Sequence, residues 1–447
     1  MDGWLNDQTL ASLAKQSGEP AWMADRRTRA LAKHQSLPWP HSSDDIWRRT
    51  DVSLLDPSRG FTLGAQDLLQ SLRMEDAQLA AWTQPLGGEH LIVRANGSWL
   101  SEPAIPGVMV QELAQAASKR QDALATALDT DSLSPAEQKL ATLNDAFHHD
   151  DVVIDVPANT SVDRPIRFVR MVAAGANSAV FPSTVITVGA GSEVTLIDEY
   201  IGVGTGSGAA PHLVNSRIEL VIEPDARVHY VRLQRWDSQA REFLLQRATL
   251  SRGATLTMAN LNLGASLSKA HIITRLSGEH ASSRIYGFVF GHAQQHVDQH
   301  TLQDHLAPHT TSDLQFRAAL QDQSRMVYTG LIRIAAAAQQ TNAYQSNHNL
   351  LLSRQAQAEA IPMLEILADD VQCKHGVSVG PIDEEQVFYL TSRAIPRLMA
   401  ERLVVMGFIE PIVEQVPFEP LQEKLRAELE GELHYETIEP AALPAGV

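Results

Sequence analysis

Short strand-forming segments recur through the middle of the chain, and each one runs directly into a turn. Their β-branched residues are followed within a few positions by Gly, Asn or Asp, which tight turns favour. The clearest segments cover 152–156, 185–188, 218–222, 247–250 and 272–276. They follow one another at roughly 25 to 35 residues, a spacing typical of solenoid arrays. The sequence therefore predicts stacked coils of β-structure over 149–380.

Regularly spaced strands also occur in β-sandwiches and jelly rolls, which are the alternative architecture. The solenoid is favoured because each unit repeats as strand, turn, strand rather than as hairpins of even spacing.

The two ends of the chain have a helical pattern. In the first region, 1–148, Leu10 and Leu13 repeat at helical spacing. A C-terminal helical region is predicted for 381–447, where the acidic run 383–385 places negative charge on a first helical turn. The expected organisation is therefore a β-core between two helical regions.

Charge and composition exclude several classes of partner. The formal net charge is -17, whereas nucleic-acid binders need a basic footprint, so no nucleic-acid partner is expected. No apolar run approaches the roughly 20 residues that a spanning helix needs, so no membrane partner is expected. The first residues also lack the pattern of a secretory signal, which makes a cytoplasmic location the expectation.

The common catalytic templates are absent from the sequence. There is no P-loop motif, no Gly-x-Ser-x-Gly elbow and no Cys-x-x-Cys pair. We therefore expect a chain that binds no nucleotide and is not itself an enzyme.

A histidine-rich stretch is the first cluster with chemical potential. If 296–300 is a strand, side chains two positions apart share one face, so His296, Asp298 and His300 could bind a divalent metal. Their structural alternative is a set of hydrogen-bonded histidines on a strand. The stretch as a whole contains His292, His296, Asp298, His300, His305 and His309.

The second cluster contains the single cysteine of the chain. Cys373 and His375 lie two residues apart, with Lys374 between them. A neighbouring Lys or protonated His lowers the pKa of a thiol, and thiolate and imidazole are suitable ligands for iron–sulfur fragments. Since such clusters usually take four protein ligands, the remaining ones would have to come from another chain. The alternative is that Cys373 is simply a small buried hydrophobe.

The segment around this second cluster belongs to a pattern that spreads over most of the chain. The pattern covers 364–376, 379–380, 383–385, 388–390 and 392–393, with 305–310, 340–343, 347–353, 18–22 and 46–50 upstream. It resembles the SufB/SufD family of the SUF system for iron–sulfur cluster assembly. Leu390, directly after the Phe-Tyr pair, stands where SufB-type chains carry a functional cysteine, so the SufD-type branch is favoured. One departure is Ala394, where the family often has Gly.

The resemblance implies a mainly β fold: a right-handed parallel β-helix core flanked by N-terminal and C-terminal helical regions. It also implies a non-catalytic scaffold subunit that pairs with SufB through the edge of the β-helix and binds the SufC ATPase through its C-terminal helices. A homodimer of the isolated chain and a flavin in the complex are left open.

The resemblance also assigns the site residues. His375, with Cys373 beside it, would bind iron or a transient nascent iron–sulfur cluster at the SufB interface. The SufC contact would fall on Asp383, Glu384, Glu385, Phe388, Tyr389, Arg393 and Pro396.

Two other functions remain as alternatives. One is a metal-dependent cupin-like enzyme built on the histidine-rich stretch, which requires a compact barrel of hairpins. The other is a purely structural β-helix adaptor without a role at the cluster.

Overall fold

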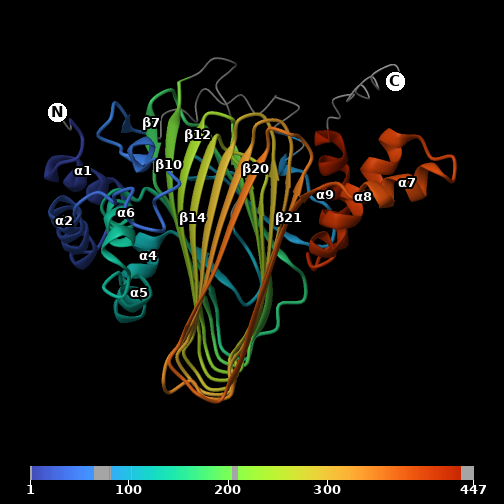
Figure 1. The fold of residues 1–447 in the computed structure, drawn as a ribbon. Helices are drawn as coiled ribbons and strands as arrows, with labels where there is room; N and C mark the ends of the chain where they lie inside the picture. Colours follow the sequence, from blue (N-terminus) through green and yellow to red (C-terminus); the bar gives the residue numbers. More distant parts are fainter. Residues whose placement is uncertain (1–2, 65–79, 81, 102, 204–209, 434–447) are drawn as a thin grey trace.

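Two facing parallel sheets form the middle of the molecule, and the chain passes back and forth between them (Figure 1). The computed structural model describes residues 3–64, 80, 82–101, 103–203 and 210–433. The predicted C-terminal region therefore extends, at 434–447, outside the described residues.

Within the described residues, sheet A has 11 strands and sheet B has 10. Sheet A contains β1 (Thr62–Leu63), β4 (Met109–Gln111), β5 (Asp150–Val156), β7 (Ser178–Val180), β8 (Pro182–Val188), β10 (His212–Ile222), β12 (Ala240–Leu250), β14 (Leu267–Leu276), β16 (His296–His305), β18 (Arg325–Ile334) and β20 (Gln357–Ile366). Sheet B contains β2 (His90–Ala95), β3 (Ser98–Trp99), β6 (Ile166–Val172), β9 (Glu193–Gly202), β11 (Arg227–Arg235), β13 (Thr255–Asn262), β15 (Ser282–Gly291), β17 (Thr311–Leu320), β19 (Thr341–Leu351) and β21 (Val371–Pro381).

This arrangement is a parallel β-solenoid. From β8 onward, each strand pairs in parallel with the strand two places along the chain, for example β14 with β16 and β15 with β17. The mainly β solenoid prediction is confirmed, and the sandwich alternative is wrong. The cupin-like barrel is wrong for the same reason, because its hairpins would pair consecutive strands antiparallel. A right-handed coil remains the expectation for parallel crossovers of this kind.

The recurring turn residues form a ladder at one corner of the coil. Their backbone lies in the left-handed region, which Gly, Asn and Asp tolerate best. Each backbone N–H donates to a carbonyl of the next coil, as from Asn159 to Ala190 at 2.8 Å and from Gln340 to Asp370 at 2.6 Å. The ladder consists of Asn159, Gly191, Asp225, Gly253, His280, His309 and Gln340.

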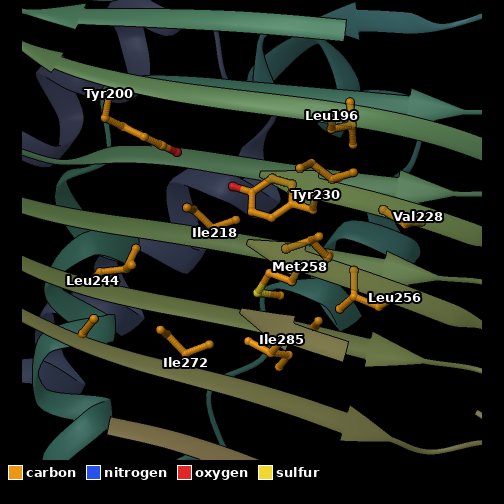
Figure 2. Close-up of a cluster of buried hydrophobic side chains, with 14 of the residues drawn as sticks. Leu196, Tyr200, Ile218, Val228, Tyr230, Leu244, Leu256, Met258, Ile272 and Ile285 are labelled. Atoms are coloured by element: carbon orange, nitrogen blue, oxygen red, sulfur yellow. The ribbon is translucent and has the colours of Figure 1, made fainter. Parts of the chain in front are cut away.

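Apolar side chains from both sheets meet inside the coil. Alternate residues of each strand point inward, so the inner face of one strand stacks on the same face of the next. Figure 2 shows this stacking for Leu196, Tyr230 and Met258 of sheet B, with Ile218 and Leu244 of sheet A opposite. This stack is the main hydrophobic core.

Helices cover the outer faces of the two sheets (Figure 1). N-terminal helices pack on sheet A, where Leu140 and Phe147 contact a cluster that includes Phe243 and Leu245. They are α1 (Asp7–Ser17), α2 (Ala21–Ser36), α4 (Leu113–Ala117), α5 (Gln121–Ala127) and α6 (Pro135–Phe147), with the 3-10 turn Val52–Leu55. C-terminal helices α8 (Arg397–Val413) and α9 (Glu419–Glu432) pack on sheet B, and the short α7 (Glu384–Thr391) precedes them.

The region 1–148 also contributes strands to the solenoid, because β2 pairs with β6 and β4 pairs with β5. Buried ion pairs fix its helices to sheet A: Arg217 of β10 binds Asp145 of α6 and, at 2.8 Å, Glu219. None of the described helices is both long enough and apolar enough to cross a membrane.

Candidate functional site

The last coil of the solenoid, made of β20 and β21, is open at its far side. These strands are the final members of their sheets, so their outer edges carry backbone groups without a strand partner. Such edges are templates for pairing with another chain. The inner face of the coil is also uncovered: Leu364 and Ile366 of β20 and Val377 and Val379 of β21 are each 39–45% exposed.

Cys373 and His375 lie on this uncovered inner face. They pair in register with Ala343 and Gln345, which are buried inside the preceding coil. Because side chains alternate along a strand, the intervening Lys374 lies on the opposite face. The strand therefore brings the thiol and the imidazole together, as the sequence predicted for an extended segment.

The environment of Cys373 raises the pKa of its thiol. The side chain is half-buried beside Ile332, Ile334 and Ala368, and this burial raises the pKa above the ordinary value of 9.0. The prediction that neighbouring basic groups lower this pKa is wrong for the chain by itself, because loss of hydration disfavours the thiolate and Lys374 lies on the other face.

His375 is exposed, and its imidazole has no hydrogen-bond or ion-pair partner among the described residues. The inner face thus offers one free imidazole and one half-buried thiol. These two ligands are too few for an iron–sulfur cluster, which usually takes four. Any cluster bound here needs ligands from a second chain.

A second apolar surface lies on the C-terminal helices. Phe388 and Tyr389 of α7 are 73% and 57% exposed, and Leu398, Met399 and Leu403 of α8 are about half exposed. Several exposed apolar side chains on two adjacent helices are typical of an interaction site.

The remaining predicted contact residues shape this helical surface. Asp383 caps α7 by accepting from the Glu385 N–H at 2.9 Å, and Glu384 binds Arg397 at 2.7 Å. Pro396 stands at the start of α8, and the Arg393 guanidinium lies 3.5 Å from the centre of the Tyr389 ring.

The histidine-rich stretch does not form the metal site that its spacing suggested. His296, Asp298 and His300 do share the outer face of sheet A, but Asp298 binds the Lys269 ammonium at 2.7 Å. His296 lies 3.0 Å from the Thr50 hydroxyl, whereas His300 lies against His271. The Thr50 hydroxyl also donates to Asp298, at 2.5 Å, so His296 and Asp298 share this partner while His300 lies apart from them.

The other histidines of the stretch lie elsewhere. His305 faces the inside of the coil and is hydrogen-bonded at both ring nitrogens, to Thr310 and Ser312. His309 stacks on His280 at an exposed corner, and His292 lies beside Phe290.

The apolar residues of the open coil are the functional feature that sequence reasoning missed. Leu364, Ile366, Val377 and Val379 repeat the alternation of every buried strand before them. Only the termination of the regular strand pattern after Pro381 indicates that no further coil covers them.

These features define a class of protein: a β-solenoid with helices on both outer faces and a free edge suited to assembly. Residues 171–408 match the family described as SUF system FeS cluster assembly, SufBD core domain, and residues 5–168 match the SufBD protein N-terminal region.

Full-length relatives have the same family description. An iron–sulfur cluster assembly SufBD family protein of Synechocystis is 26% identical over 430 residues, covering 94% of this chain and 93% of the relative. Proteins of the same description from Staphylococcus epidermidis and Staphylococcus aureus are each 23% identical over 444 residues, with 96% and 94% covered. The chain belongs to the SufBD family of the SUF system for iron–sulfur cluster assembly.

Proposed function

We propose that this chain is the SufD-type, non-catalytic scaffold subunit of a cytoplasmic SUF complex. In this proposal its open last coil pairs with SufB, its C-terminal helices bind the SufC ATPase, and His375 with Cys373 contributes ligands for a nascent cluster. The observation that carries the proposal is the placement of an imidazole and a thiol on the inner face of an uncovered coil.

The pairing with SufB is supported by the edges of β20 and β21. A partner with a similar last coil would satisfy the free backbone groups and cover the exposed Leu364, Ile366, Val377 and Val379. Burial of four such side chains would contribute several kcal/mol, since each is worth roughly 1.5 to 3 when fully buried from an exposed state. The same edge could pair with a second copy of this chain when SufB is absent.

The SufC contact is supported by α7 and α8. These helices leave Phe388, Tyr389 and Leu403 in solvent, although α8 and α9 bury a continuous apolar stripe against sheet B. Because α8 and α9 pack on the solenoid, a movement of the bound ATPase would be transmitted to the edges of β20 and β21.

The ligand role is supported by the chemistry of the two side chains. The His375 imidazole is available without breaking a contact, and iron binding would favour the thiolate of Cys373 against the effect of burial on its pKa. Ligands from SufB would complete the set, so this chain supplies only part of the cluster site.

The test is co-expression with SufB and SufC, size-exclusion chromatography, and anaerobic measurement of iron and sulfide. We expect His375→Ala to keep the complex but to lower its iron and sulfide content at least severalfold. The matched control is His348→Ala on the adjacent strand β19, whose imidazole binds Ser378 at 2.6 Å and points to the opposite face. Equal iron and sulfide content in the two variants would contradict the ligand role and would favour the purely structural adaptor.

Two surface variants test the partner assignments. Val377→Asp places a charge on the inner face and is expected to prevent SufB pairing, whereas Leu100→Asp, at a similarly exposed apolar position, is not. The Phe388→Asp variant is expected to lose binding to SufC and to keep binding to SufB. Retention of both partners by both variants would contradict the proposed surfaces.

A further inference from the structure

A buried group of three metal-ligand side chains lies far from the open coil, beneath helix α6. Glu137, His271 and His300 each offer one ligand atom, and these atoms lie within 4.8 Å of one another. Glu137 comes from the first turn of α6, and the histidines come from the outer face of sheet A. The group therefore spans the contact between the N-terminal helices and the solenoid.

Strand pairing fixes the two histidines side by side. His271 of β14 and His300 of β16 are register partners, and their rings lie 5.1 Å apart at 76°. Trp47 covers this pair from outside, with its ring 5.5 Å from that of His271. The imidazoles are thereby held in place and shielded from water.

The capping box of α6 fixes the carboxylate. The Ser134 backbone N–H and hydroxyl donate to Glu137 Oε2 at 2.9 and 2.7 Å. The other oxygen, Oε1, lies 3.1 Å from His271 Nδ1. One carboxylate oxygen is thus committed to the helix cap, while the other points at the histidines, an arrangement in which outer hydrogen bonds orient a ligand.

Two nitrogens in this group have no partner. The Nε2 atoms of both His271 and His300 are buried, and neither makes a hydrogen bond within the described part of the protein. A buried polar group left without a hydrogen-bond partner destabilises the folded state. A cation bound between Glu137 Oε1 and His271 Nδ1 would give His300 Nε2 a partner.

The ammonium group on this face is already paired with a carboxylate. The Lys269 ammonium lies on the same face, but its charge is balanced by Asp298 at 2.7 Å. Glu137, Lys269 and Asp298 together carry one net negative charge, which a divalent ion would convert to one net positive charge.

We propose that Glu137, His271 and His300 bind one divalent transition-metal ion of the zinc or ferrous-iron type, which fixes helix α6 to sheet A. Two imidazoles and a carboxylate form a donor set that both ions accept. The ion has a structural role here and is separate from any cluster at Cys373 and His375.

The test uses the full-length chain carrying His375→Ala and Cys373→Ser, so that the open coil binds no metal. After treatment with EDTA, the protein is titrated with Co²⁺, whose visible absorption reports its coordination, then with Zn²⁺ in competition and with Fe²⁺ under anaerobic conditions. We expect one equivalent to bind and the thermal midpoint to rise with Zn²⁺, since a ligand of the folded state stabilises it.

Two variants locate the ion. Glu137→Gln keeps the capping box, and His300→Gln keeps a polar group of similar size; both are expected to weaken Co²⁺ binding at least tenfold. The matched control is His296→Gln, on the same strand and face as His300, which should bind Co²⁺ like the parent. Circular dichroism and size-exclusion chromatography check that each variant is folded.

The preference between Zn²⁺ and Fe²⁺ identifies the ion. The proposal is overturned if the parent shows no saturable Co²⁺ binding, or if the folded Glu137→Gln and His300→Gln variants bind as tightly as the parent. Loss of binding in His296→Gln alone would place the ion at His296 and Asp298 instead, and would overturn the proposal. Because the open coil is disabled throughout, none of these outcomes depends on the proposed cluster site.

Discussion

Acid should destabilise this protein through His305, a histidine buried inside the solenoid. The side chain is fully buried, with Nδ1 2.8 Å from the Thr310 hydroxyl and Nε2 2.9 Å from that of Ser312. Burial lowers the pKa of this imidazole from 6.5 to about 4. The folded chain therefore keeps it neutral at pH values where the unfolded chain protonates it.

The sign and size of the effect follow from proton linkage. Stability is fully present above pH 6.5 and falls as the pH drops toward 4, because the unfolded state then binds the additional proton. For pKa values of 6.5 and about 4, the free energy of unfolding should fall by about 2 kcal/mol between pH 7 and pH 5 from this residue alone.

The assay is urea unfolding at pH 7 and pH 5, followed by tryptophan fluorescence and by circular dichroism. His305→Gln keeps a hydrogen-bonding side chain that does not titrate, so its loss of stability between the two pH values should be smaller by about 2 kcal/mol. Ser312→Ala keeps the titrating ring and should retain the pH dependence. Equal acid sensitivity of His305→Gln and the unsubstituted chain would refute the reasoning.

Three other substitutions test the fold. Ala394 has a φ of 64°, so Ala394→Gly should stabilise the chain by roughly 0.5 to 1 kcal/mol in urea unfolding at pH 7; a loss of stability would contradict this. A Cβ at Gly278 would lie 2.0 Å from the Arg252 backbone nitrogen, and we expect Gly278→Ala to cost about 3 kcal/mol or more, seen as a lower thermal midpoint. Arg217→Met should cost roughly 2 to 3 kcal/mol, because Asp145 and Glu219 lose this partner but keep Arg26 and Arg247. Calorimetry should show a lower thermal midpoint, and an unchanged midpoint would contradict this.

The repeat could be predicted from the sequence because its cause is local. Each coil needs a left-handed corner residue, and Asn159, Asp225 and Gly253 mark such corners. Between the corners, alternating side chains indicate strands, so the segments predicted at 152–156 and 218–222 lie within β5 and β10. Parallel stacking follows from the period of the repeat.

The placement of Cys373 and His375 on one face could also be predicted, because its cause is local. Two residues separated by one on a strand must share a face. The pKa of the thiol was not predictable in this way, because it depends on burial beside Ile332 and Ala368, which belong to other segments. The predicted activation by Lys374 was therefore wrong although the geometry was right.

The sequence by itself determined the β-solenoid, its helical ends and the strand that carries Cys373 and His375, since periodicity and turn chemistry act over a few residues. Only the tertiary structure decided which apolar strands stay uncovered and which histidines meet. Glu137 and His271 are 134 residues apart in the chain, and they approach each other because a packed helix places its first turn over two stacked strands.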